Sequence, residues 1–107
     1  MAYQEALAVL ADPTRRAVFE RLREGPRAVG EIAAGLPVTR PAVSQHLRVL
    51  KQAGLVQDEP RGTARLYRIH APGLAALRAW LDSFWDEPLE RFKAHAERGV
   101  APDEEKS

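Results

Sequence analysis

The chain has 107 residues, of which 45 % are hydrophobic, and a formal net charge of +1. This length allows one folded domain with one modest core, and no apolar run approaches the ~20 residues that a membrane helix needs. The chain has no cysteine, which excludes disulfides and thiolate metal sites and fits a reducing compartment. Because the N-terminal residues also lack the basic start of a signal peptide, we expect a cytoplasmic protein without a membrane partner.

Positive charge is concentrated in one part of the sequence. Residues 1–70 carry a net charge of +4, and residues 71–107 carry −3. Between residues 40 and 68 alone, six basic residues stand against two acidic ones. Such a region favours an anionic partner such as nucleic acid, and a solvated basic face without any partner is the alternative.

Three short helices are predicted before residue 38. The first, residues 1–11, has apolar side chains at helical spacing. The second begins at "DPTRR", where Asp12 is a suitable N-cap and Pro13 suits the first helical position, and it should stop at Gly25 and Pro26. The third is the short run "AVGEIAAGL", which is expected to bury Val29, Ile32 and Leu36.

A fourth helix is predicted over "TRPAVSQHLRVLKQA". Thr39 can cap its N-terminus, and Pro41 falls in the first turn, where proline is tolerated. Its apolar positions recur at steps of four, three and four and should form a buried stripe: Val43, Leu47, Leu50 and Gly54. The opposite side should expose five polar side chains: Arg40, Ser44, Gln45, Arg48 and Lys51.

A basic hairpin is predicted next. "LVQDE" and "RLYRI" are strand-like runs on either side of "PRGTA", where Pro60 and Gly62 mark a turn with Arg61 near its tip. A short helix, a tight turn and a longer helix with a polar outer face form a helix-turn-helix, and a following hairpin makes the winged version. Polar side chains on such a helix can read base edges in the major groove, which is about 12 Å wide.

One long apolar helix should end the fold. It is expected to begin near Pro72 and run toward Gly99, with Pro88 kinking or breaking it near Phe84. Its aromatic surface exceeds what one side of a helix can bury in so small a domain, so we expect the two terminal helices to pair with their copies in a homodimer. The alternatives are a helix folded over its own core or a surface for a small hydrophobic effector. The candidate interface residues are Tyr3, Leu7, Leu10, Leu74, Leu77, Leu81, Phe84 and Trp85.

The predicted fold is therefore mainly α with a small β-hairpin, a winged helix-turn-helix of about five helices. A single domain should cover residues 1–99, and residues 100–107 should form a disordered acidic tail. Within the domain, the expected parts are terminal dimerisation helices at 1–11 and 72–98, a helical core at 12–54 and a wing at 55–69.

Three stretches together resemble the ArsR-type winged helix-turn-helix repressors: "LADPTRRAVFERLREG", "GEIAAGLPVTRPAVSQHLRVLKQAGLV" and "RGTARLYRI". The resemblance covers roughly residues 3–92. It implies a small homodimer that represses transcription by binding a pseudo-palindromic operator. The DNA contacts that it implies come from Thr39, Arg40, Ser44, Gln45 and Arg48 on the recognition helix and from Arg61 and Arg65 on the wing. Lys51 lies a turn farther along the helix, where we expect a phosphate contact or simple solvation and not base readout.

Metal and enzyme chemistry are not expected. The family's best-known metal motif is a Cys-x-Cys, which here falls on Ala28 and Gly30, and neither side chain can bind a metal. His70 and His95 do not form the Asp-x-His pair of a second family site, and His46 is expected to be a packed, hydrogen-bonded histidine. No nucleophile with a neighbouring base, glycine-rich phosphate loop or HExxH motif is present. We therefore predict no metal, no cofactor and no enzymatic activity.

Two other functions stay open. One is a winged-helix module whose polar face and terminal aromatics bind other proteins, and the other is a regulator that responds to a ligand or metal at a non-cysteine site. The sequence leaves undetermined the operator, the regulated genes, the inducer and the choice between repression and activation.

Overall fold

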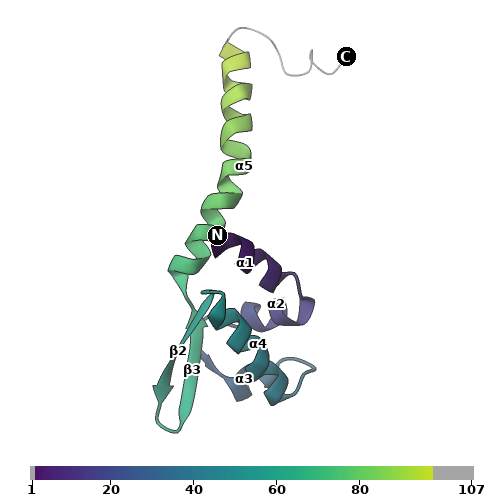
Figure 1. Cartoon of the computed structure of the whole chain (residues 1–107), viewed down its shortest axis with the longest axis vertical. Helices are drawn as coiled ribbons and strands as arrows, with labels where there is room; N and C mark the ends of the chain where they lie inside the picture. The colour runs from purple at the N-terminus through teal and green to yellow at the C-terminus, as the bar shows by residue number, and fades with distance from the viewer. Residues whose placement is uncertain (1, 98–107) are drawn as a thin grey trace. The chain divides into compact units, whose positions relative to one another are not determined.

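The computed structural model describes residues 2–97, which form five α-helices and a three-stranded sheet (Figure 1). The elements in chain order are α1 (Ala2–Leu10), α2 (Pro13–Glu20), β1 (Arg27–Ala28), α3 (Val29–Ala34), α4 (Arg40–Gln52), β2 (Val56–Arg61), β3 (Ala64–Ile69) and α5 (Ala71–Glu97). The mainly α fold with a small β element is confirmed. The tail predicted at residues 100–107 lies outside the described residues.

The chain divides into two compact units between Leu77 and Arg78, within α5. The first unit holds every element from α1 to β3 together with the start of α5. In this unit the helices α1–α4 gather on one side of the β2–β3 hairpin (Figure 1). The second unit begins with the rest of α5. The candidate recognition helix and the wing therefore belong to the same compact unit.

The junction between α1 and α2 is closed by polar groups. The carboxylate of Asp12 accepts the backbone N–H of Arg15 at 3.0 Å, and Pro13 occupies the first turn, as predicted. Arg15 and Arg16 donate in turn to carbonyl oxygens of α1, at 3.3 and 3.1 Å. The N–H of Arg15 lowers the pKa of Asp12, so the cap is charged at neutral pH and its contribution to stability is lost as pH falls through that lowered pKa.

The third helix is shorter than its predicted apolar run. Ile32 is fully buried, whereas Val29 and Leu36 are only half-buried, which corrects the expectation that all three lie in the core. The reason is that α3 spans just Val29–Ala34, so Leu36 falls in the turn that follows it. A helix of six residues can direct only one turn of side chains into the core.

Helix α4 matches its prediction closely. The hydroxyl of Thr39 accepts the backbone N–H of Ala42 at 3.2 Å and so caps the first turn. At the other end, Gly54 has a φ of 78°, a left-handed conformation that glycine adopts without a steric penalty. Its N–H and that of Leu55 donate to carbonyls of the last turn of α4, both at 3.0 Å, which ends the helix in a Schellman motif.

The predicted wing is part of a larger sheet. The strands are antiparallel in the order β1-β3-β2, so the two-residue strand β1, which the sequence did not predict, adds a third strand to the hairpin. Arg61 pairs with Ala64, which leaves Gly62 and Thr63 as the loop. The positive φ of Gly62 (64°) suits a tight two-residue hairpin turn. Pro60 lies in β2 and not in the turn where the sequence placed it.

Helix α5 is continuous over Ala71–Glu97, so Pro88 does not break it, and the alternative of a kink near Phe84 stays a prediction. Its start is fixed within the first unit, because the N–H of His70 donates to the carbonyl of Leu55 at 2.8 Å. None of the helices among residues 2–97 is both long enough and apolar enough to cross a lipid bilayer.

The core of the first unit draws side chains from most of its elements. The largest fully buried ones are Val18, Leu22, Ile32, Val43, Leu47, Leu50 and Leu55. Three of these seven come from α4, and all three are 0 % exposed. Val43, Leu47 and Leu50 of the predicted stripe therefore hold α4 against the rest of the unit. Gly54, the fourth predicted member, is only half-buried, because it lies beyond the last helical residue and ends the helix instead.

Replacing Leu47 by alanine should destabilise the fold by about 2–5 kcal/mol, because it removes a fully buried side chain and leaves a cavity. Ser44→Ala changes an exposed position of the same helix and should alter the free energy of unfolding by less than about 0.5 kcal/mol. Urea unfolding followed by circular dichroism measures both variants. Equal stability of the two would contradict the assignment of the buried stripe.

Candidate nucleic-acid interface

The exposed side of α4 carries the polar side chains that the sequence assigned to it. The side chains of Arg40, Ser44, Gln45, Arg48 and Lys51 are all exposed, as is the cap residue Thr39. Helical periodicity explains this arrangement, since burial of every third or fourth residue turns the intervening ones outward. The helix thus presents hydrogen-bond donors and acceptors, three of them cationic, to solvent.

Arg40 does not simply extend into solvent. A Cβ atom on Gly30 would lie 2.9 Å from its Nη2 atom, so the guanidinium lies directly over the first turn of α3. Arg40 and Arg65 also line one pocket together with Gly30 and Tyr67. Sequence reasoning missed this approach because Gly30 and Arg40 are ten residues apart and have no shared pattern.

The two faces of the hairpin have different surroundings. Because strand residues alternate between faces, Asp58, Arg65 and Tyr67 share one face, while Glu59, Arg61 and Arg68 share the other. The first face adjoins α4, since Asp58 and Tyr67 line a pocket together with Ser44, Arg48 and Lys51. Arg65 therefore lies on the face beside α4, and Arg61 lies at the loop on the opposite face.

Asp58 links α4 to the wing. Its Oδ1 lies 2.8 Å from Nζ of Lys51, and its Oδ2 lies 2.7 Å from Nε of Arg65. Its side chain is only 7 % exposed, whereas the two cations are about half exposed. Lys51 first, and then Arg65, hold the pKa of Asp58 below its usual value, so the carboxylate is charged at neutral pH and loses its charge only as pH falls through that lowered pKa.

A second polar cluster lies on the other face of the hairpin. With its amide oxygen turned toward Arg68, at 2.6 and 2.7 Å, Gln57 donates to Nδ1 of His70 at 2.6 Å. Arg68 also lies 3.5 Å from a carboxylate oxygen of Glu59. His70 is thus held in a hydrogen-bond network at the base of the wing. Among residues 2–97, no group of three or more potential metal-ligating side chains comes together.

His46 departs in part from its prediction. It is half-buried beside the stripe of α4, as expected for a packed histidine. Its buried Nδ1, however, has no hydrogen-bond partner among the described residues. The Nδ1 atom of this packed ring therefore lacks the hydrogen bond that the sequence predicted.

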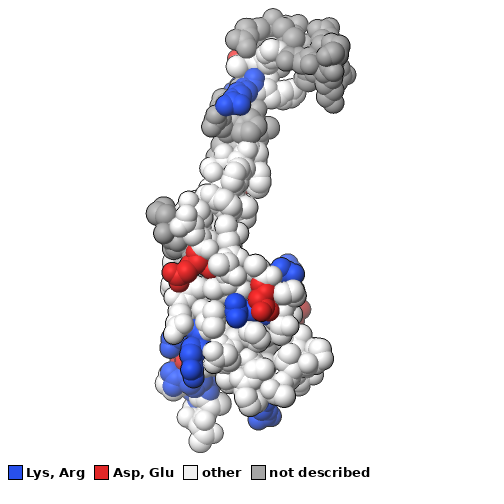
Figure 2. All heavy atoms as spheres, turned by 45° about the vertical axis from the view of Figure 1, so that its right-hand side comes forward, with Lys and Arg blue, Asp and Glu red and all other residues white. Residues whose placement is uncertain are grey.

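Basic side chains gather on part of the hairpin surface. Figure 2 shows Lys and Arg gathered at the lower left of the molecule, where the hairpin lies. The exposed arginines of the hairpin are Arg61, Arg65 and Arg68. This cluster and the cations of α4 belong to one compact unit and could approach a polyanion together.

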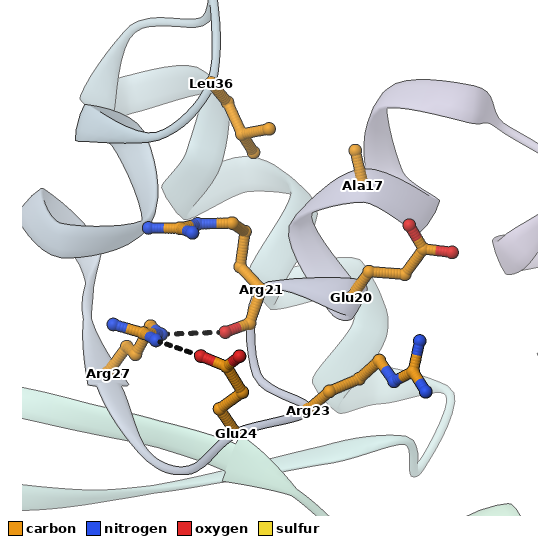
Figure 3. A pocket seen from close by; sticks show the side chains of 7 residues that line it. All are labelled: Ala17, Glu20, Arg21, Arg23, Glu24, Arg27 and Leu36. Atoms are coloured by element: carbon orange, nitrogen blue, oxygen red, sulfur yellow. Dashed lines mark hydrogen bonds and ion pairs between the residues drawn. The ribbon is translucent and has the colours of Figure 1, made fainter.

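The arginines near α2 are used differently. Arg21, Arg23 and Arg27 line a pocket there (Figure 3). The other lining residues are Ala17, Glu20, Glu24 and Leu36. Within it, Arg27 donates to the carbonyl of Arg21 at 2.8 Å and lies 3.3 Å from a carboxylate oxygen of Glu24 (Figure 3). The pocket lies between the end of α2 and β1. None of its lining residues belongs to the exposed side of α4.

The candidate dimer residues differ in how much surface they leave exposed. In the first unit, Leu7 is 39 % exposed, Tyr3, Leu10 and Leu74 are half-buried, and Leu77 is almost fully covered within the single chain. In the second unit, the large apolar side chains that are exposed among the described ones are Leu81, Phe84, Trp85 and Phe92. Leu77 therefore has little surface left for a partner, while the later residues of α5 have much.

Known proteins similar to this chain are helix-turn-helix regulators, in agreement with the fold described above. Residues 10–59 match a family described as a helix-turn-helix domain, a segment that contains α2, α3 and α4. The chain is 62 % identical over 84 residues to the HTH-type transcriptional regulator Rv2034 of Mycobacterium tuberculosis, covering 78 % of each chain. It is 48 % identical over 65 residues to the HTH-type transcriptional repressor SmtB of the same species, covering 61 % of this chain and 48 % of SmtB.

A solved structure gives the same family. The homodimeric winged helix-turn-helix DNA-binding domain of Mb0332 from Mycobacterium bovis, described as a possible ArsR-family transcriptional regulator, has a TM-score of 0.65 and 32 % sequence identity. The similarity covers 84 % of this chain and 83 % of that one. With a polar recognition helix, a basic wing and these relatives, the chain belongs to the ArsR family of winged helix-turn-helix transcriptional regulators.

Proposed function

We propose that this chain acts as a homodimeric repressor that binds a pseudo-palindromic operator through α4 and the wing. The observation that carries the proposal is the two-sided character of α4, whose stripe is 0 % exposed while its opposite side exposes Arg, Lys, Gln and Ser. These are the side chains that hydrogen-bond to base edges and phosphates in the major groove. Such a regulator acts by binding and not by catalysis, and it acts in the cytoplasm.

The expected roles follow from position on the helix and the wing. Thr39 caps α4, and Arg40, Ser44 and Gln45 lie in its first half, the part that contacts bases in helix-turn-helix proteins. Arg48 follows one turn after Ser44 on the same exposed side and is expected to contact bases as well. Lys51 lies near the C-terminus of the helix, so it contacts a phosphate. Arg61 at the hairpin loop and Arg65 beside α4 contact the backbone or the adjacent minor groove.

A dimer is part of the proposal because one recognition helix reads only a half-site. The Mb0332 domain is homodimeric, and α5 of this chain exposes Leu81, Phe84 and Trp85. Pairing of the terminal helices would bury this apolar surface. A two-fold axis then separates the recognition helices by about 34–36 Å, one turn of DNA. Repression follows if the bound dimer excludes polymerase from the promoter.

Selection of duplexes from a random pool at about 150 mM salt should recover an inverted repeat with half-site centres one turn apart. The double variant Gln45→Ala/Arg48→Ala should lose this preference, because it removes two side chains that can pair with base edges. Arg23→Ala removes the same single positive charge at an exposed position outside α4 and the wing, and it should keep the preference. An unchanged preference in the double variant would remove α4 from the role of recognition helix.

Arg61→Ala should weaken binding to all duplexes alike and lower the slope of log affinity against log salt by about one unit, the effect of losing one phosphate contact. Fluorescence anisotropy with a selected and a scrambled duplex over a salt series gives both quantities. A slope equal to that of the unaltered protein would show that Arg61 makes no phosphate contact. A loss confined to the selected duplex would instead assign Arg61 to base readout.

Leu81→Glu/Phe84→Glu should convert the dimer to a monomer, because it places two charges on one apolar side of α5 without touching the core of the first unit. Ala79→Glu adds a charge on another side of the same helix and should leave the dimer intact. Sedimentation velocity at micromolar concentration distinguishes the two states, and circular dichroism checks the fold. If both variants remain dimeric, this part of α5 does not form the interface.

A further inference from the structure

The position of Asp58 within the proposed DNA-binding surface is unexpected. A carboxylate repels phosphate groups, yet this one lies on the hairpin face beside α4, between Lys51 and Arg65. It is also shielded, since only 7 % of the side chain is exposed. A residue that served solely to keep the wing soluble would be exposed, so the burial of Asp58 indicates a role toward its two partners.

The geometry of the two ion pairs leaves both cations able to bind a further anion. Arg65 pairs with Asp58 through Nε, and the guanidinium also carries four N–H donors on its two Nη atoms. Lys51 contributes one of its three ammonium donors to Asp58. Because each cation is about half exposed, a phosphate can approach the remaining donors while Asp58 stays bound.

The three residues lie on three different elements. Lys51 is in α4, Asp58 is in β2, and Arg65 is in β3. The bridge therefore relates the recognition helix to the wing at a point where the two hairpin strands also pair with each other. The pocket beside it is lined by Ser44 and Arg48, so the bridged cations are next to side chains proposed to read bases.

This arrangement affects specific and non-specific binding differently. Unrestrained lysine and arginine side chains can reach phosphates in many poses, and such contacts carry no sequence information. Cations held at a fixed separation meet two phosphates well only when α4 lies at one depth and angle in the groove. The carboxylate itself weakens attraction to any DNA. Asp58 should therefore lower general affinity while it favours the docked pose in which base contacts form.

We propose that Asp58 is a positioning residue that determines specificity, because it holds Lys51 and Arg65 in register between α4 and the wing. The inference rests on the proposed function, since it assumes that this surface binds DNA. It assigns to Asp58 an effect on the ratio of specific to non-specific affinity and not on stability alone.

The test compares Asp58→Asn with Glu59→Gln in the full-length chain. Both variants remove one negative charge from β2, but Glu59 pairs with Arg68 on the opposite face of the hairpin. Both should bind a scrambled duplex somewhat more tightly than the unaltered protein. Only Asp58→Asn should lower the ratio of selected-duplex to scrambled-duplex affinity, by roughly tenfold, which is the size of one mismatched base pair.

A second comparison shows whether Asp58 acts through its partners. In the background Lys51→Gln/Arg65→Gln, the further change Asp58→Asn should leave the affinity ratio unchanged, because there is nothing left to position. Thermal melting by circular dichroism checks that each variant is folded, and Asp58→Ser replaces Asp58→Asn if the latter unfolds.

The outcomes separate this inference from the proposed function. Equal affinity ratios for Asp58→Asn, Glu59→Gln and the unaltered protein would overturn the role of Asp58 and leave the operator-binding function standing. A fall in the ratio that persists in the Lys51→Gln/Arg65→Gln background would also overturn it, because Asp58 would then act without these cations. An unaltered protein that shows no preference for any duplex would overturn the proposed function and this inference with it.

Discussion

Burial of one side of α4 is the constraint on which the remaining structure depends. Val43, Leu47 and Leu50 are fully enclosed, and α4 contacts α1, α2, α3 and β2. Close packing of this kind allows little rotation of the helix about its axis, because any rotation would expose apolar side chains and open voids. The direction in which Gln45 and Arg48 point is therefore set by the buried side chains on the other side of the helix.

The wing depends on the same helix. The Schellman motif at Gly54 turns the chain directly from α4 into β2, and the backbone of His70 returns to Leu55 at the end of β3. Both ends of the hairpin are thus fixed beside the C-terminus of α4. Asp58 adds a polar link farther along the hairpin, with its charge shared between Lys51 and Arg65. Apolar packing sets where the wing begins, and electrostatics influences the separation between wing and helix.

The apolar residues of the terminal helices α1 and α5 fall into two groups, one covered by the chain itself and one exposed. In the first unit, Ala6 and Val9 of α1 and Leu77 of α5 are covered by the single chain, so these residues contribute to the core. Phe84, Trp85 and Phe92 in the second unit are each about half exposed. Exposed apolar side chains of this kind are typical of interaction surfaces. A second copy of the chain covers them in the function proposed above.

Much of the fold and the candidate site was determined by the sequence alone, because the signals were local. The cap at Thr39, the stripe of α4 and the glycine at its end are encoded within a single stretch of fewer than twenty residues, and they predicted which side chains are exposed. Tertiary structure alone decided the features that join distant segments. Strand β1 pairs with β3 although its two residues carry no strand pattern. Arg40 lies over Gly30, and Asp58 of β2 pairs with Lys51 of α4. Periodicity and capping report the conformation of neighbouring residues, whereas these contacts depend on where the folded chain returns to itself.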